Sequence, residues 1–246
     1  MTVDLAAIPT EERQRSLPAI VNGNGTSTID YLDSLRTPSL PLVQTMANEL
    51  LEEFGLVSEV SSKKSETAVT KCNRPATISK YPWFNLSHIR DYLRFRTLLY
   101  RASDFEDVLR YFVERQDQGH VSIVKIDYAK LTRPGAFGWR MIAVDIRITA
   151  TGMLVEHYMT FREMIEVNEA WLHKVYEAWR SVSTDDMTIE ELRAFNRDTG
   201  FSRHAYRELL FDGILREQPA GSIEAAQRRA AGQAILGKLT STLNLR

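Results

Sequence analysis

The sequence has little cysteine and no strong bias of charge. Among 246 residues the single cysteine is Cys72, which excludes an internal disulfide framework and a cysteine-based zinc site. Lysine and arginine total 31, aspartate and glutamate total 32, and the formal net charge is −1. This balance excludes a strongly basic nucleic-acid-binding protein and an acidic disordered one. A local basic site stays compatible with it, because charge acts where it is clustered.

Long apolar runs and several nucleotide-binding and hydrolase signatures are also missing. No stretch approaches the roughly 20 apolar residues that cross a bilayer, and the N-terminus carries acidic residues where a signal peptide is basic. We therefore expect a soluble, cytoplasmic protein with no membrane contact. The sequence has no GxSxG, Walker A or GxGxxG motif, and its histidines lack HxH, HxxxH and HExxH spacing. Hydrolase, P-loop, Rossmann and zinc-enzyme interpretations therefore have no support.

The chain is predicted to have three parts. Residues 1–40 contain prolines and an Asn/Gly run, which favours turns; we expect a flexible N-terminal arm, with one docked helical turn at 29–32 as the alternative. Order is expected from Pro41, with a domain over 41–182. Residues 183–246 are predicted to be a helical C-terminal extension, whose basic last helix would contact RNA or an anionic partner, or would instead cap the domain or form an oligomer.

The middle part is predicted to be an α+β layer, with a mixed β-sheet and helices packed on one face. The strands are expected at 92–99, 121–128, 141–148 and 153–159, the last two as a hairpin. The helices are expected at 42–54, from 104 to near 119, and at 161–181, and a polar loop is expected at 61–68. In the extension, helices are expected from a capping box at Thr188 to Gly200, over 202–216, and from Ser222.

Basic residues gather ahead of the first predicted strand. Lys71, Arg74 and Lys80 alternate through an irregular stretch, which suits a polyphosphate because a loop can surround it with several donors. A solvated loop is the alternative.

A carboxylate and two arginines lie at the start of the same strand. Asp91 precedes the strand, and Arg94 and Arg96 are two residues apart, so both arginines are expected on one face of the sheet. The alternative is a structural ion pair.

A second carboxylate lies in a strand that should be central. Glu156 is flanked by apolar residues and shares a face with Tyr158. A carboxylate there costs several kcal/mol unless it is paired or binds a metal. Asp91 and Glu156 could therefore meet as a two-carboxylate Mg²⁺ site, since hard cations take oxygen ligands.

An aromatic residue enters the predicted strand at 141–148. Gly138 would allow a ligand to approach the backbone, and the indole of Trp139 offers a stacking platform beside Arg140. An ordinary loop aromatic is the alternative.

Taken in order, these clusters resemble the synthetase domain of the RelA/SpoT family, the alarmone synthetases, over about residues 65–180. The family pattern is a basic loop, D-x-x-G-x-R opening a strand, G-Y-R-S-L-H at the next strand, E-x-Q-I-x-T on the following strand, and a helical H-x-x-Y. The corresponding segments of this chain are 71–80, 91–96, 138–143, 156–160 and 173–176.

The resemblance implies a nucleotidyltransferase-like fold and transfer of the β,γ-pyrophosphate of ATP to a ribose 3′-hydroxyl. It implies that Asp91 and Glu156 are the catalytic carboxylates that hold Mg²⁺. Substrate-binding residues would be Lys71, Arg74, Lys80 and Arg96 on the ATP phosphates, with Trp139, Arg140 and Tyr158. Further site candidates are Arg94, Lys125, His173 and Tyr176.

Three departures concern the acceptor side: Arg94, Ala143 and Tyr158 replace a glycine, a histidine and a glutamine of the family pattern. The acceptor could be GDP or GTP, an adenine nucleotide, or the 3′ end of tRNA. No segment resembles the family's hydrolase domain, so the chain would fit a growth-arresting toxin with an antitoxin partner, a housekeeping synthetase, or a homo-oligomer of either. The alternative is a degenerate relative that binds a nucleotide or a partner without catalysis.

Overall fold

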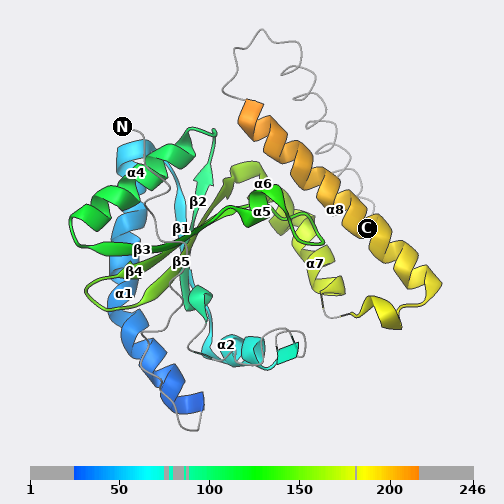
Figure 1. Cartoon of the computed structure of the whole chain (residues 1–246), viewed down its shortest axis with the longest axis horizontal. Helices are drawn as coiled ribbons and strands as arrows, with labels where there is room; N and C mark the ends of the chain where they lie inside the picture. Colours follow the sequence, from blue (N-terminus) through cyan, green and yellow to red (C-terminus); the bar gives the residue numbers. More distant parts are fainter. Residues whose placement is uncertain (1–24, 75–77, 80–85, 87–88, 181, 216–246) are drawn as a thin grey trace. The chain divides into compact units, whose positions relative to one another are not determined.

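Five strands form one mixed sheet in the order β1-β2-β5-β4-β3 (Figure 1). The computed structural model describes residues 25–74, 78–79, 86, 89–180 and 182–215. The strands are β1 Ser58–Ser62, β2 Leu93–Leu99, β3 Val121–Asp127, β4 Ile142–Ile148 and β5 Leu154–Phe161. The α+β class and the four predicted strands are confirmed. The expected hairpin joins β4 and β5, which pair antiparallel, and Gly152 in its turn has φ +73°.

Helices and helical turns make up most of the remaining described residues. They are α1 Gly25–Phe54, α2 Ser65–Cys72, η3 Arg90–Tyr92, α4 Asp104–Asp117, α5 Ala129–Thr132, α6 Arg162–Val167, the π-helical η4 Asn168–Leu172, α7 His173–Trp179, η5 Thr184–Asp186 and α8 Ile189–Leu215. The run α6–η4–α7 is continuous, which confirms the helix expected at 161–181. None of the described helices is long and apolar enough to cross a membrane.

The sheet has one apolar and one polar face. On the apolar face, the ring of the fully buried His157 lies 4.3 Å from that of Phe95 on β2 and 4.8 Å from that of Phe112 on α4, between centroids. Because side chains alternate along a strand, Arg96 on β2 and Glu156 on β5 project from the opposite face. The pairing register adds Asp145, which lies directly opposite Glu156.

Contacts divide the chain into two compact units. The first comprises residues up to Leu98, Glu106–Asp127 and Ile142–Met159; the second comprises Leu99–Phe105, Tyr128–Met141 and Thr160 onward. Both predicted carboxylates belong to the first unit, whereas Trp139 belongs to the second. Each unit is described by itself below.

The first helix begins earlier than predicted. Residues 25–40, expected within a flexible arm, belong to α1, which contains Pro38 and Pro41; residues 1–24 lie outside the described residues. Tertiary contacts explain the difference: Leu32 is buried, Ser39 bonds Thr151 at 2.6 Å, and Asp33 accepts a hydrogen bond from a tyrosine hydroxyl. These contacts offset the hydrogen bonds that prolines remove from a helix interior.

The prediction of a polar loop over 61–68 is wrong in part. Ser61 and Ser62 end β1, and α2 begins at Ser65. Strand β1 pairs antiparallel with β2 at the edge of the sheet, so its sequence needs no apolar alternation to be stable there.

Helix α8 replaces two predicted helices. It runs through Gly200, where we expected a stop, while the capping box is confirmed by Glu191 N–H donating to Thr188 Oγ1 and Thr188 N–H donating to Glu191. Ala205 and Tyr206 are buried, and their packing outweighs the roughly 1 kcal/mol that a glycine costs inside a helix. The helix expected from Ser222 lies outside the described residues.

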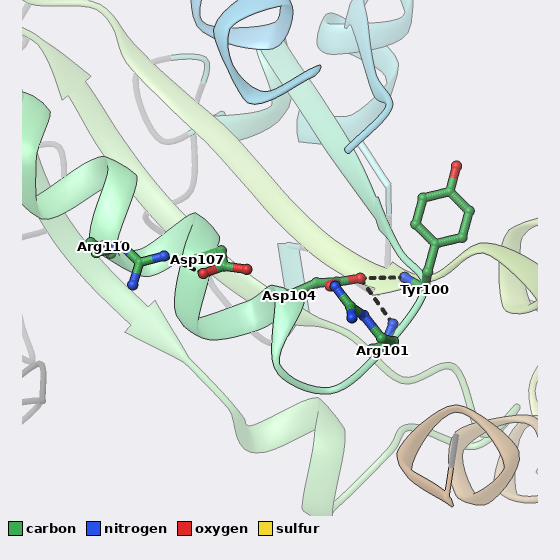
Figure 2. A network of polar contacts seen from close by, with 5 residues as sticks. All are labelled: Tyr100, Arg101, Asp104, Asp107 and Arg110. Atoms are coloured by element: carbon green, nitrogen blue, oxygen red, sulfur yellow. Dashed lines mark hydrogen bonds and ion pairs between the residues drawn. The ribbon is translucent and has the colours of Figure 1, made fainter. Parts of the chain in front are cut away.

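A buried carboxylate organises the turn before α4. The Asp104 carboxylate accepts hydrogen bonds from the backbone N–H groups of Tyr100 and Arg101 at 2.7 and 2.9 Å (Figure 2). Farther along the helix, Arg110 pairs with Asp107 one turn away. The first arrangement satisfies amide groups that would otherwise lack partners.

Candidate active site

Asp91 lies in η3, immediately before β2, where the sequence predicted it. Its φ and ψ of −90° and 24° are not helical, and it is 9% exposed. One carboxylate oxygen lies 2.9 Å from Lys71 Nζ, and the other lies 3.0 Å from Lys63 Nζ. Both oxygens are therefore held by lysines.

The two lysines determine the charge state of Asp91. Burial by itself would raise the pKa of this carboxyl, but Lys71 and then Lys63 outweigh burial and lower the pKa below its ordinary value. Asp91 is therefore an anion throughout the neutral range, and a ligand that draws the lysines away would leave that anion available to a cation.

Glu156 has the opposite electrostatic environment. Burial raises the pKa of its carboxyl, and the negative charge of Asp91 raises it further, while Arg90 and Lys71 oppose the change. The charge of Asp91 therefore acts on Glu156, the other predicted carboxylate. Within the part of the chain that the structure describes, Glu156 makes no hydrogen bond or ion pair, so its carboxylate is available to accept a proton or bind a cation.

A third carboxylate lies beside Glu156. Asp145 on β4 is 3% exposed and directly opposite Glu156 in the antiparallel register. Its Oδ2 pairs with Arg90, the residue before Asp91, whereas Oδ1 has no hydrogen-bond partner among the described residues. Burial raises the pKa of Asp145 despite the arginine.

The predicted arginines lie on the polar face, as expected. Arg94 donates to Ser61 at 3.0 Å, and Arg96 pairs with Glu59, so each contacts edge strand β1. Tyr158, half-buried, also lies on this face. It faces Ala143 across the β4–β5 pair.

The other predicted cations of the first unit take different positions. Lys125 Nζ lies 3.5 Å from Asp127. Its position in β3 is opposite Asp145, and its charge lowers the pKa of that carboxyl. Arg74 is half-buried just after α2, and Lys80 lies outside the described residues.

Trp139 and Arg140 are held by elements of the second unit. The indole of Trp139 packs edge-on against the ring of Tyr206 on α8, with centroids 5.3 Å apart. Arg140 donates to the carbonyl of Leu131, and its Nε is buried with no partner among the described residues. Burial and then Arg207 lower the pKa of Arg140.

His173 and Tyr176 lie together on α7. Their rings stack with centroids 6.2 Å apart, and His173 lies 3.6 Å from Glu177. The ring of Tyr176 also packs against Phe137 at 5.5 Å. In the second unit these contacts place Tyr176 beside the loop that carries Trp139.

Three residues of this site were missed by the sequence analysis. Lys63 lies in the segment expected to be a polar loop, and Arg90 lies just before the predicted strand at 92–99. Asp145 had a usable signal, because it is a carboxylate within an apolar predicted strand, as Glu156 is. The ion pairs themselves left no signal in the sequence, because they join residues that are 20 to 55 positions apart.

The donors present suit Mg²⁺ that is shared with phosphates. Asp91 and Glu156 offer oxygen ligands, and no group of three or more His, Cys, Asp or Glu among the described residues forms a complete metal site. Mg²⁺ is ordinarily held by one or two carboxylates together with substrate phosphates and water. The chemistry of this donor set therefore fits the metal that the resemblance implies.

Comparison with solved structures finds similar chains, one of them a small alarmone synthetase. The small alarmone synthetase 1 from Bacillus subtilis has a TM-score of 0.48 and 12% identity, over 73% of this chain and 90% of that one. The structure of smu.1046c from Streptococcus mutans UA159 has a TM-score of 0.46 and 13% identity, over 80% and 96%. A GTP pyrophosphokinase family protein from Streptococcus pneumoniae has a TM-score of 0.43 and 13% identity, over 72% and 87%. No family model and no curated protein matches the sequence.

Proposed function

We propose that this protein transfers the β,γ-pyrophosphate of ATP to a ribose 3′-hydroxyl. The observation that carries the proposal is that two carboxylates with opposite pKa shifts, Asp91 and Glu156, lie in one unit and that the charge of Asp91 acts on Glu156. Asp91 is held as an anion between Lys63 and Lys71, and the half-buried Glu156 has a raised pKa. The order of the motifs along the chain supports the same reaction.

Each group has a role in this transfer. The oxygen–phosphorus bond forms between the 3′-hydroxyl and the β-phosphorus of ATP, the bond from the β-phosphorus to its bridge with the α-phosphate breaks, and AMP leaves. Glu156 accepts the hydroxyl proton at its carboxylate, for which a raised pKa makes it a stronger base. Lys63, Lys71 and Arg96 bind the phosphates, and orienting the reactants supplies much of the rate.

The proposed metal is Mg²⁺, which Asp91 would hold. Glu156 would either be its second carboxylate ligand or act as the base, because a bound cation lowers the pKa of a carboxyl. When bound, Mg²⁺ would neutralise charge on the phosphates. In the absence of triphosphate, the lysines occupy both oxygens of Asp91.

Incubation with γ-labelled ATP, Mg²⁺ and each acceptor tests the proposal: GDP, GTP, AMP or tRNA. We expect label in at least one acceptor with the wild-type protein and a loss of at least about a hundredfold in Glu156→Gln, the size typical of losing a general base. Glu106→Gln, an exposed carboxylate on α4, is the matched control and should keep full activity. Label in no acceptor would overturn the proposal and favour a non-catalytic nucleotide-binding relative.

The acceptor and the cellular role are further parts of the proposal. Substitutions at Arg94, Ala143 and Tyr158 fit a changed acceptor, with the tRNA 3′ end and adenine nucleotides as candidates beside GDP and GTP. As a toxin, the protein would arrest growth when expression is induced, and Asp91→Ala would relieve the arrest. Harmless expression of an active enzyme would contradict the toxin role and the need for an antitoxin.

A further inference from the structure

A pair of oppositely charged residues outside the predicted set links the positions of the two carboxylates. Arg90 precedes Asp91 in η3, and its guanidinium binds Oδ2 of Asp145. Asp145 in turn lies directly opposite Glu156 across the β4–β5 pair. One ion pair therefore ties the turn that carries Asp91 to the strand beside Glu156.

The ion pair adds to the contacts that hold the turn at Asp91, where the Tyr92 hydroxyl donates to Asp33 at 2.6 Å. The backbone of this turn leaves the helical region, with φ −90° and ψ 24°, within a three-residue element. Such a short element has little hydrogen bonding of its own to fix it. The ammonium groups of Lys63 and Lys71 hold the Asp91 side chain, and the backbone N–H of Lys63 donates to the carbonyl of Tyr92 at 2.9 Å. The two ammonium groups are ones that a triphosphate would draw away. The contact between Arg90 and Asp145 involves neither lysine.

A contribution to stability does not explain why a carboxylate occupies position 145. The carboxylate is almost fully buried, and one of its oxygens has no hydrogen-bond partner among the described residues. A buried carboxylate of this kind is weak evidence of stabilisation, and apolar replacement of such pairs is often neutral or stabilising. Destabilising polar groups are typical of functional sites.

We propose that Arg90 and Asp145 are a positioning pair, which sets where the Asp91 carboxylate lies relative to the Glu156 carboxylate. The pair touches neither substrate nor reacting atoms in this role; it acts through the turn and the strand. The inference rests on the proposed function, because the distance between the two carboxylates matters only where they act together.

The double variant Arg90→Met/Asp145→Leu tests the pair. Because small displacements of reacting groups reduce rates steeply, we expect kcat to fall roughly 10- to 100-fold. The KM for ATP should change less than about threefold, since the phosphate-binding lysines are unaltered. The melting temperature should stay at or above that of the wild type. Arg90→Lys, which keeps the charge, should retain part of the rate.

The matched control is Arg110→Met/Asp107→Leu, on α4 (Figure 2). Its arginine side chain is 43% exposed, the same as that of Arg90, and α4 covers the apolar face of the sheet. Its kcat should equal that of the wild type. An unchanged kcat in the Arg90/Asp145 variant, or a loss that only follows a lower melting temperature, would overturn the positioning role.

Metal binding separates this inference from the proposed function. The affinity for Mn²⁺, measured by electron paramagnetic resonance with α,β-methylene-ATP present, should weaken at least about fivefold in the Arg90/Asp145 variant and not in the control. If the wild type transfers no label, the proposed function fails. In that case, a weaker Mn²⁺ affinity in the Arg90/Asp145 variant still supports the positioning pair. Equal Mn²⁺ affinities in the variant and the wild type, or no Mn²⁺ binding at all, would overturn it.

Discussion

At the scale of single residues, the candidate site places carboxylates where folding disfavours them. Glu156 and Asp145 both have raised pKa values because they are buried, and only Asp91 has a lowered pKa, because two lysines outweigh its burial. The folded state therefore holds two of its three site carboxylates at a cost in stability. Such a cost is expected where catalytic groups need a particular protonation behaviour.

Replacement of Glu156 by glutamine should stabilise the protein at neutral pH. The pKa of Glu156 is raised on folding, so the folded state binds the proton more tightly than the unfolded state does. The contribution of Glu156 to the free energy of unfolding is therefore greatest below its ordinary pKa and is lost as the pH rises through the raised pKa. Thermal unfolding at pH 7 should show Glu156→Gln melting higher than the wild type, by an amount on the order of 3 °C.

Thermal unfolding of the wild type and Glu156→Gln at pH 4 tests the direction of this pH dependence. There the two proteins should melt within about 1 °C of each other, because Glu156 is largely protonated in both states. The exposed Glu106→Gln should show no difference at either pH. A variant that melts lower than the wild type at pH 7 would mean that ionised Glu156 is stabilised by a partner.

At the scale of elements, helix α8 fixes the loop that carries Trp139. Ser202 Oγ and Arg203 Nε donate to the carbonyls of Phe137 and Ala136, at 2.6 and 2.5 Å. Gly138 has φ +81°, and a Cβ at this position would lie 2.5 Å from the Cα of Arg203. The backbone of the loop and that of α8 are thus in direct contact.

Gly138→Ala should destabilise the protein more than a typical surface change does. The left-handed φ alone costs on the order of 1–3 kcal/mol for a residue with a side chain, and the clash with a backbone atom adds to it. Urea unfolding measures the difference, with Gly135→Ala as control because nothing lies within 4 Å of its Cβ position. Equal midpoints for the two variants would contradict the close packing against α8.

Asp104→Ala should destabilise the start of α4. The substitution leaves the N–H groups of Tyr100 and Arg101 without the carboxylate that accepts from both (Figure 2), at a cost of about 1–3 kcal/mol. Asp107→Ala, which breaks the partly exposed pair with Arg110, should cost less than about 1 kcal/mol. Chemical denaturation of both variants checks the order, and a larger loss for Asp107→Ala would contradict it.

At the scale of the whole molecule, the two faces of the sheet carry different kinds of residues: one packs in the apolar core and the other carries candidate site residues. Its apolar face carries Phe95 and the buried His157 against Phe112 of α4, and its polar face carries the site carboxylates and arginines. Burial lowers the pKa of His157 to about 3. The core therefore contains a neutral imidazole whose Nε2 contacts Thr97 Oγ1 at 2.8 Å.

Because of His157, the free energy of unfolding should decrease as the pH is lowered. The unfolded state takes up a proton near pH 6.5 and the folded state only near pH 3, so stability is full above pH 6.5 and falls as the pH decreases toward 3. Between pH 7 and pH 4 the loss from this group is on the order of 3 kcal/mol. His157→Gln, which does not titrate, should show a flatter decline in urea unfolding across this range. Parallel declines would contradict the neutral buried state.

The strands and long helices were predictable because their signals are local. Alternation marked β2 and β5, and the spacing of Val108 and Phe112 marked α4. The edge strand β1 was missed, since a strand that pairs on one side keeps a polar sequence. The start of α1 and its passage through Pro38, like the course of α8 through Gly200, depend on distant contacts that outweigh local propensity.

The sequence by itself determined the α+β class and the shared face of Arg94 and Arg96, because these follow from periodicity. It predicted Asp91 and Glu156 as candidate site carboxylates, Glu156 because it is a charge within an apolar run. Only the tertiary structure decided that Lys63 and Lys71 hold Asp91, and that Arg90 reaches Asp145. The physical reason is that pKa values and ion pairs depend on burial and on groups far apart in the chain, which come together only when the sheet forms.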